Sequence, residues 1–547
     1  MPLSYNGNLI VKITAQPFAN LFAEDVGNRP VAFAGYVLEP LSTAPALSAQ
    51  FSLEAPADHW ALARAEQPAL GKNPWDAAHE AAAAADYAHY VEPDILHERA
   101  VAPPATQSDG GMDGHWPPHA DVSPGWHLDA SYTGFSVVRQ TTRGKGIIIG
   151  HLDTGYTPKH ASTPRYVLSD YGYDFWDDTP GAIDPGTGGA LLNTPGHGTA
   201  TLALLAGNEL DLTFGNHRFQ GDFGGAPDAQ IVPVRISPSV VHLYTSSMAK
   251  GLYHALAPNG DTSKRCDVVT ISHGGLPTNA WADAVNMLYD NGVVVVAASG
   301  DCYALKVVNI ATRYTVYPSA FNRVITALGA TFEKKPYITD DFGQMQGCWG
   351  PDSVMEKAIA AFTPNVAWMA YDDLPSGFGM HGSGTSASTP QIAAACALWL
   401  SLYQDPTLTG WQRVEACRLA LFASAANNRQ DVSELGWGLL DVPAMLDAKL
   451  AKKAIVQARG GQPSHEDKVS WPILTLLFGG SQPGSARERM YETEVAQIIM
   501  SSTNPTLAQA THFADTATTL APNDAAVVLS ALAREDLSQS LRARLGL

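Results

Sequence analysis

Short apolar runs alternate with longer amphipathic segments between residue 146 and about residue 448. The runs GIIIGHLD, QIVPVRI, DVVTIS, VVVVAAS and RVITALG have strand length and few polar positions. Segments with helical spacing, such as SSMAKGLYHALA and AWADAVNMLYDN, lie between them. Apolar strands that alternate with helices are typical of a parallel sheet covered by helices on both faces. We therefore predict an α/β domain over residues 126–450, with its chemistry at the carboxyl ends of the strands.

The pattern differs on either side of this domain. Residues 1–100 contain the strand-like NLIVKIT, VAFAGYVL and YVEPDIL and the helix-like PWDAAHEAAAAA, which predict a small α+β domain. Residues 101–125 are rich in Pro, Gly, Ser and Asp, a composition typical of a flexible linker. Residues 451–547 pass through FGGSQPGS into segments with helical spacing, and we expect a helical extension that packs on the main domain or on a partner.

Composition narrows the function classes. The chain of 547 residues has 45% hydrophobic and 16% charged residues, as expected of a globular protein with a large core. Its 34 basic and 53 acidic side chains give a net charge of -19, which argues against nucleic-acid and anionic-membrane partners. Apolar runs stay shorter than the roughly 18 residues of a membrane span.

Location and thiol chemistry follow from the chain's start and its cysteines. The N-terminal sequence has no basic leader followed by an apolar core, so we expect a cytoplasmic protein, with export by another route left open. The five cysteines are an odd number without CxxC spacing, which favours buried or free thiols over a disulfide framework or a zinc site.

The first chemical motif is Leu152-Asp153-Thr154-Gly155, which directly follows an apolar strand and so places a carboxylate at a strand end. The Asp-Thr-Gly triplet also marks aspartic proteases, in which two carboxylates share a proton. The sequence lacks a second such triplet. That alternative would therefore require a dimer.

Two further motifs each open an apolar segment with helical length. His197 lies in GHGTA before TLALLAG, where the glycines allow other backbone to approach closely. Ser386 lies in GTSASTP before QIAAACALWL. At a helix start, unpaired amides and the helix dipole favour a developing negative charge.

The three motifs together supply a nucleophile, a base and an orienting carboxylate. A serine hydroxyl is a poor nucleophile until a base takes its proton, and the base needs a carboxylate that holds its tautomer. We expect Ser386 to attack, His197 to transfer the proton and Asp153 to orient His197. Because the three residues are far apart in the sequence, each can come from a different strand end or helix start.

The region from residue 126 to 448 resembles the subtilisin-like serine proteases, or subtilases, in which the triad follows the order Asp, His, Ser. The resemblance extends to GAPDA before QIVPVRI, to SHGG at residues 272–275 and to GWGLLD at residues 436–441. It implies the subtilase α/β sheet and a serine endopeptidase that hydrolyses peptide bonds. The resemblance implies no cofactor for the chemistry itself, and loops in many subtilases hold calcium.

YVEPD at residues 90–94 resembles the end of a subtilase inhibitory prodomain. The resemblance implies a zymogen, in which residues 1–100 assist folding, block the cleft and are released by cleavage in or near the linker. A permanently attached N-terminal domain is the alternative.

One position departs from the family. Where subtilases usually have Ala-Gly-Asn after the strand VVVVAA, this sequence has Ser299-Gly300-Asp301. The family's asparagine donates to the oxyanion, together with the backbone N–H of the nucleophile, here Ser386. An ionised Asp301 has no donor and would repel the oxyanion, whereas a protonated Asp301 can donate. We therefore expect activity at lower pH than is usual for subtilases.

The resemblance also implies where a substrate lies. An extended peptide would add a strand between Ser272-His273-Gly274 and the segment 239–242, with Gly300 beside it. His273 occupies a position that is often apolar in the family, so it either recognises an acidic side chain or simply packs. The acidic loop with Asp174, Asp177, Asp178 and Asp184 is a calcium candidate or a solvated loop, and we assign no metal ligands.

Two other functional hypotheses remain open at this point. One is a pseudoprotease or gated peptide-binding protein, which Asp301 alone supports. The other is a dedicated intracellular processing protease that recruits one partner through the segment after Lys452.

Overall fold

The structure is a computed structural model. It describes residues 3–14, 17, 21–22, 31–41, 58–66, 71–85, 87–98, 122–186, 196–240, 242–303, 314–339, 341, 344–369, 377–426, 433–471, 477–478, 485–510 and 522–547. The predicted linker, 101–125, lies outside these residues except for its last four positions.

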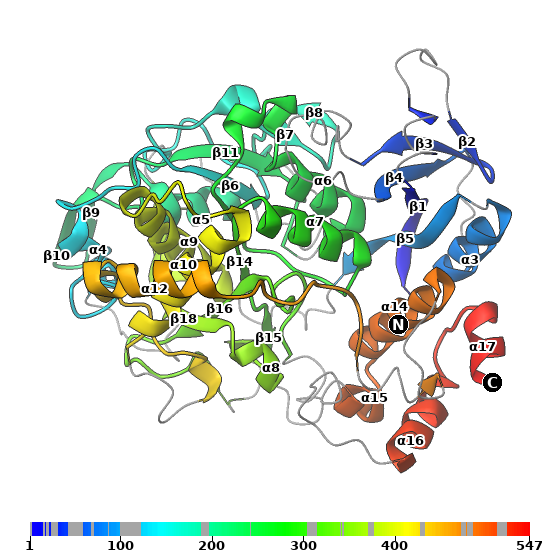
Figure 1. The fold of residues 1–547 in the computed structure, drawn as a ribbon. Coiled ribbons are helices and arrows are strands. Elements are labelled where there is room, and N and C mark those ends of the chain that lie inside the picture. Colours follow the sequence, from blue (N-terminus) through cyan, green and yellow to red (C-terminus); the bar gives the residue numbers. More distant parts are fainter. Residues whose placement is uncertain are drawn as a thin grey trace.

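An eight-stranded sheet forms the centre of the main domain (Figure 1), in the order β18-β16-β14-β13-β6-β11-β7-β8. Six of its strands are parallel and almost wholly buried, which explains their continuous apolar sequences. They are β6 (Ile148–Asp153), β11 (Gln230–Arg235), β13 (Val268–Ile271), β14 (Val294–Ala298), β16 (Val324–Ala330) and β18 (Ala358–Phe362). The short β7 (Tyr173–Asp174) and β8 (Thr179–Pro180) complete one edge. The predicted α/β class, a parallel sheet flanked by helices, is confirmed.

Helices cover both faces of this sheet. One face packs against α6 (Thr245–His254) and α7 (Asn279–Asp290), and the other against α5 (His197–Ala206), α9 (Thr385–Leu402) and α10 (Gly410–Ser424). Helix α12 (Ala448–Gly460) places three alanines, Ala451, Ala454 and Ala458, in the second of these cores. The main domain thus continues about ten residues past the boundary expected at residue 450.

In its described residues, the N-terminal domain is a sheet that packs against a helix. Its strands are β1 (Ser4–Thr14), β2 (Val31–Phe33), β3 (Tyr36–Pro40), β4 (Asp58–Ala65) and β5 (Ala88–Glu98), and its helix is α3 (Pro74–Ala84). Strand β5 also pairs with β12 (His242–Tyr244) of the main domain, so one sheet contains strands of both domains. The apolar side chains of β1, β4 and α3 share a single core with α6 and α7. The N-terminal domain is therefore docked on the main domain through a continuous core.

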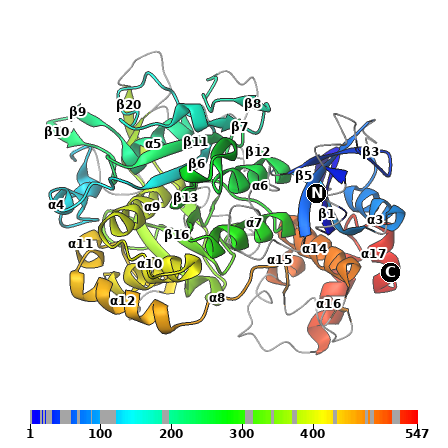
Figure 2. The same cartoon turned by 45° about the horizontal axis from the view of Figure 1, so that its top comes forward.

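The C-terminal segment folds into helices that lie beside the N-terminal domain, far from the sheet face that α12 covers. They are α14 (Ala486–Ser501), α15 (Pro505–Ala510), α16 (Pro522–Leu532) and α17 (Gln539–Leu545). Both views place α14 and α17 next to β5 and α3 (Figures 1 and 2). The expected helical extension thus packs on the chain's first hundred residues as well as on the main domain.

The remaining elements are short. The strands are β9 (Glu209–Phe214), β10 (His217–Asp222), β15 (Asp301–Tyr303), β17 (Met345–Gly347), β19 (Val366–Met369) and β20 (Phe378–Gly382). The helices are α4 (Phe135–Val138), α8 (Asp352–Met355) and α11 (Val442–Met445), and the described 3-10 helices each have three residues. Within the described residues, no helix combines the length and apolarity of a membrane span.

Candidate active site

The register of three neighbouring strands gathers the candidate residues at one edge of the sheet. Leu152 of β6 pairs with Ile271 of β13, and Ile271 pairs with Ala297 of β14. Because parallel strands end at the same edge, Asp153, Ser272 and the turn that leads to Asp301 follow side by side. The sheet thus positions residues that are separated by more than a hundred positions in the sequence.

Helix α5 brings His197 to the same edge. Its first turn lies so close to the end of β6 that a Cβ on Gly198 would fall 1.9 Å from the Gly155 carbonyl oxygen, which explains the glycine after the histidine. The Gly198 N–H also donates to the Thr154 hydroxyl at 3.0 Å. The strand end and the helix start are therefore locked together.

Asp153 and His197 form a direct hydrogen bond. The distance from His197 Nδ1 to Asp153 Oδ1 is 2.7 Å, and the Thr154 N–H donates to the same oxygen at 2.7 Å. Asp153 is 1% exposed and His197 7% exposed, so water does not compete for this contact. With Nδ1 engaged, Nε2 of His197 is the ring nitrogen left to act as a base.

The second oxygen of Asp153 has partners that the sequence analysis did not identify. The Thr201 hydroxyl lies 3.0 Å from Asp153 Oδ2, and His151 Nε2 lies 2.9 Å from that hydroxyl. Burial raises the pKa of the Asp153 carboxyl, but the charge and hydrogen bond of His197 outweigh it, and the pKa ends well below its usual range. Asp153 is thus held as a carboxylate.

A periodic signal for both residues exists in the sequence. His151 precedes Asp153 by two positions and so lies on the same side of its strand, and Thr201 follows His197 by four and so lies on the same side of its helix. Burial lowers the pKa of His151 to about 4, which keeps its ring neutral at physiological pH.

Ser386 is the second residue of α9 and is tied to the end of β13. Its hydroxyl donates to the Ser272 carbonyl at 3.4 Å, and the Ser272 hydroxyl donates to the Ser386 carbonyl at 3.1 Å. Among the contacts of the described residues, the Ser386 hydroxyl has no hydrogen bond to His197. Nucleophile and base hydrogen bonds often form fully only with substrate present.

Asp301 lies beside the start of α9. Its Oδ1 accepts a hydrogen bond from the Thr385 N–H at 2.8 Å, and the Gly300 N–H donates to the Thr385 hydroxyl at 3.1 Å. A Cβ on Gly384 would fall 2.7 Å from Asp301 Oδ2, and Gly384 has a φ of +79°, so both space and backbone conformation require glycine there. Asp301 is therefore anchored next to Ser386, with one carboxyl oxygen engaged by the helix start.

His273 is a buried neighbour of His197. Its ring is 3% exposed and meets the His197 ring edge to face at 5.7 Å, while Trp368 contacts His197 at 5.5 Å. Neither ring nitrogen of His273 has a hydrogen-bond partner among the described residues. Burial lowers the pKa of His273 to about 4, so the ring is neutral at pH 7. A neutral, buried ring favours the packing role over recognition of an acidic side chain.

The end of β5 lies beside β12 and Leu276, next to the two segments predicted to hold a substrate. Leu96, His97 and Glu98 pair antiparallel with β12, and His97 Nδ1 accepts a hydrogen bond from the Leu276 N–H at 3.0 Å. A Cβ on Gly275 would fall 2.6 Å from the His97 ring, so this glycine makes room for it. Glu92 of β5 contacts the Asn279 and Ala280 amides and His97 contacts Leu276, so successive residues of β5 approach the segment that begins at Ser272.

The acidic loop is engaged by protein groups. Arg235 pairs with both Asp174 and Asp177, and Asp184 accepts hydrogen bonds from the Gly186 and Gly196 amides. Asp178 accepts a hydrogen bond from Tyr173. In the part of the chain that the structure describes, no group of three or more His, Cys, Asp or Glu residues is placed to hold a metal ion. The carboxylates paired with Arg235 do not fit a calcium site.

The thiols behave as the sequence indicated. All five cysteines lie in described segments, all are buried, and no disulfide joins them.

A buried Asp-His pair beside a serine at a helix start, on the edge of a parallel sheet, is the arrangement of the Asp-His-Ser hydrolases. The model of the subtilase family matches residues 144–438, about half of the chain. The chain belongs to the subtilase family and is a subtilisin-like serine protease.

Characterised relatives match the same region. Subtilisin DY of Bacillus licheniformis is 28% identical over 313 residues, which cover 56% of this chain and 93% of that protein. Thermitase of Thermoactinomyces vulgaris is 25% identical over 261 residues, 47% of this chain and 76% of that protein. The crystal structure of fervidolysin from Fervidobacterium pennivorans, described as a keratinolytic enzyme related to subtilisin, superposes with a TM-score of 0.52 at 18% identity. That superposition covers 81% of this chain and 61% of fervidolysin, and it supports the fold.

Proposed function

We propose that the chain is a serine endopeptidase in which Ser386 is the nucleophile, His197 the general base and Asp153 the orienting carboxylate. The observation that carries the proposal is the buried 2.7 Å contact between His197 Nδ1 and Asp153 Oδ1 beside the start of α9. His197 takes the Ser386 proton as the hydroxyl oxygen attacks the peptide carbonyl. It then returns the proton to the leaving amine, and water repeats the sequence on the acyl-enzyme.

The oxyanion of the tetrahedral intermediate would receive the Ser386 backbone N–H and a second donor from Asp301. Since Asp301 Oδ1 already accepts the Thr385 N–H, the donating oxygen must be Oδ2, and it must carry a proton. The rate of wild-type enzyme should therefore fall at alkaline pH, where that proton is lost.

We further propose that the protein is made as a zymogen inhibited by its N-terminal domain. Three features support this: β5 pairs antiparallel with β12, Asp94 accepts hydrogen bonds from the Ser246 N–H and hydroxyl at 2.8 Å, and Glu92 accepts from the Asn279 and Ala280 amides at 3.1 Å. Both carboxyls thus sit at the starts of α6 and α7, where amides are unsatisfied. A docked domain with these contacts excludes substrate.

The register of β5 also limits the cleavage site. His97 lies beside Leu276, and Ser272, four residues earlier on the same segment, contacts Ser386. Two extended segments that lie side by side advance by the same length per residue. The peptide bond that would lie at Ser386 is therefore about four residues past His97. This is at the start of the linker that the sequence predicts.

An active-site-directed fluorophosphonate tests the nucleophile, because it forms a stable bond only with a serine activated by a base. Wild-type protein freed of its N-terminal domain should be labelled on Ser386, as mapped by mass spectrometry. His197→Ala and Ser386→Ala should not be labelled. Wild type without label, together with binding of an extended peptide, would support the pseudoprotease instead.

A further inference from the structure

The C-terminal helix α14 is packed into the contact between the N-terminal domain and the main domain. It lies against β5 and α3 on one side and near the start of α7 on the other (Figures 1 and 2). Ten consecutive residues of α14, from Met490 to Ile499, are buried, and each exposes no more than a few per cent of its surface. No part of the proposed chemistry requires this helix.

Thr493 is the centre of a junction between three parts of the chain. Its hydroxyl lies 2.8 Å from the Tyr90 hydroxyl of β5 and 2.8 Å from the Asn279 side-chain amide at the start of α7. Asn279 also donates to the Tyr90 hydroxyl at 3.0 Å. Thr493 is fully buried and Tyr90 is 2% exposed, so replacing the Thr493 hydroxyl removes two buried hydrogen bonds that cross the contact.

Gln497, one turn further along α14, makes a second bridge of the same kind. Its Oε1 accepts a hydrogen bond from the Trp75 indole of α3 at 3.0 Å. Its Nε2 donates to the Pro277 carbonyl, just before α7, at 2.9 Å. The Gln497 side chain is fully buried and connects the N-terminal domain directly to the main domain.

Glu494 extends the contact to the last helix. The fully buried carboxyl lies 3.2 Å from His79 of α3 and accepts hydrogen bonds from the Ser538 N–H at 2.7 Å and the Ser538 hydroxyl at 2.9 Å. Ser538 is the cap of α17. At the rim, the Gln539 N–H donates to Asp76 at 2.7 Å.

The segment before α14 is itself fastened to the main domain. Asp467 accepts the Arg323 N–H at 3.0 Å, and its own N–H donates to Asn286 at 2.9 Å. The Val469 N–H donates to Asn279 at 3.0 Å, so the same asparagine contacts both the segment and Thr493. Cleavage in the linker would therefore leave α14 in place on the main domain.

From these contacts we infer that α14, together with the start of α7, forms a binding surface for the chain's own N-terminal domain and retains that domain after the linker is cut. Its partner is the α3/β5 face of residues 71–98, recognised through buried hydrogen bonds at Thr493, Gln497 and Glu494. The role as a retainer after cleavage rests on the proposed zymogen. The docking surface itself does not.

The test uses full-length Ser386→Ala protein with the recognition sequence of an added site-specific endopeptidase inserted in the 101–124 linker. After the added enzyme cuts, size-exclusion chromatography measures how fast the N-terminal fragment leaves. We expect the fragment to co-elute with the rest of the chain. Thr493→Val with Gln497→Leu should release it at least about tenfold faster, because the two changes together remove four buried hydrogen bonds across the contact and leave the Trp75 indole without its acceptor.

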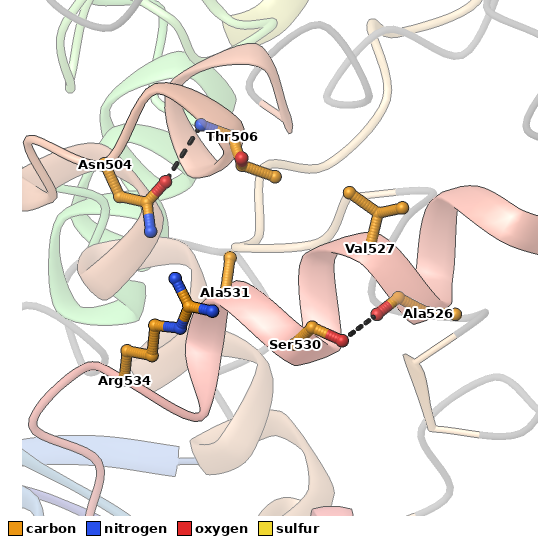
Figure 3. Close-up of a pocket in the computed structure, with 7 residues that line it drawn as sticks. All are labelled: Asn504, Thr506, Ala526, Val527, Ser530, Ala531 and Arg534. Carbon is orange, nitrogen blue, oxygen red and sulfur yellow. Dashed lines mark hydrogen bonds between the residues drawn. The ribbon is translucent and has the colours of Figure 1, made fainter.

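Ser530→Ala is the matched control for loss of a hydroxyl. Figure 3 shows Ser530 in a pocket lined by residues of the C-terminal segment: Asn504, Thr506, Ala526, Val527, Ser530, Ala531 and Arg534. Its exposed hydroxyl donates to the Ala526 carbonyl within the same helix, and among the described residues it has no hydrogen bond to the N-terminal domain. This variant should retain the fragment as the parent does.

A second variant guards against misfolding of the C-terminal helices. Trp75→Phe removes the indole donor on the opposite side of the contact. In the double variant with Gln497→Leu, the increase in release rate should be smaller than the sum of the two separate increases, because both changes remove the same Trp75–Gln497 hydrogen bond. Equal retention in the parent and the Thr493/Gln497 variant, or strictly additive effects, would overturn the inference. Because the chain is catalytically silenced and cut by an added enzyme, absence of self-cleavage would refute the zymogen proposal without affecting this result.

Discussion

Asp301→Asn should speed the enzyme at neutral and alkaline pH. The substitution preserves the shape of the side chain, and its carbonyl oxygen can keep the Thr385 N–H contact that Asp301 Oδ1 makes at 2.8 Å. The amide nitrogen then replaces Oδ2 and supplies a permanent donor beside the start of α9. In the wild type the same position carries an acceptor whenever Asp301 is ionised.

The size of the effect follows from the missing donor. One oxyanion donor in a subtilase is worth roughly a hundred- to a thousandfold in turnover, and the ionised carboxylate adds repulsion. We therefore expect the Asn variant to be faster by at least about a hundredfold at pH 8, with a smaller advantage at pH 4 to 5, where a protonated Asp301 can donate.

The assay is kcat and KM on an extended peptide from pH 4 to 9, with enzyme freed of the N-terminal domain. Asp301→Ala is the control, because it removes both the anchor to Thr385 and the donor, and it should stay slow at every pH. If kcat has the same pH dependence at alkaline pH in the wild type and in Asp301→Asn, the role assigned to Asp301 is wrong.

Three further changes test the site and its surroundings. Gly198→Ala places a Cβ 1.9 Å from the Gly155 carbonyl oxygen, so it should displace the catalytic histidine and lower kcat by at least about a hundredfold, while Ala200→Gly in the same helix should lower only the melting temperature. Thr201→Val removes the hydroxyl that lies 3.0 Å from Asp153 Oδ2, so the charge of that carboxylate is less neutralised. The acid limb of the pH–rate profile should therefore move to higher pH by about half a unit, and Thr201→Ser should restore the wild-type profile. His127 is fully buried, both of its ring nitrogens lack a hydrogen-bond partner among the described residues, and burial lowers its pKa to about 3. As pH falls, the unfolded chain therefore binds a proton at His127 before the folded chain does, and stability is lost between about pH 6.5 and pH 3. His127→Phe should remove about 2 kcal/mol of acid destabilisation at pH 5, seen as one fewer proton in the pH dependence of unfolding; an unchanged pH dependence would contradict this.

Local patterns were enough to predict the sheet and the triad motifs. The apolar runs around Asp153 and before Asp301 are strands β6 and β14, and His197 and Ser386 do open helices. Buried parallel strands and helix starts have strong local signatures, because most side chains of such a strand are apolar and a helix start must accommodate unpaired amides.

Contacts between segments that are distant in the sequence could not be predicted from local patterns. The bridge from Thr493 to Tyr90 joins residues about four hundred positions apart, and neither residue differs locally from an ordinary core threonine or tyrosine. For the same reason α14 was expected to pack on the main domain or an unnamed partner, without any indication of β5 and α3. His151 and Thr201 could have been found from their two- and four-residue spacing to the triad, but that spacing identifies a neighbour only once the triad is assumed.

The central claim is that Ser386, activated by His197, cleaves peptide bonds, first of all in its own chain. Intact mass measured after incubation of wild type and Ser386→Ala at pH 5 and pH 8 tests it most directly, because no external substrate is needed. The account predicts loss of a fragment of about the first hundred residues in the wild type alone, faster at pH 5. Full-length wild type at both pH values, or the same cleavage in Ser386→Ala, would contradict it.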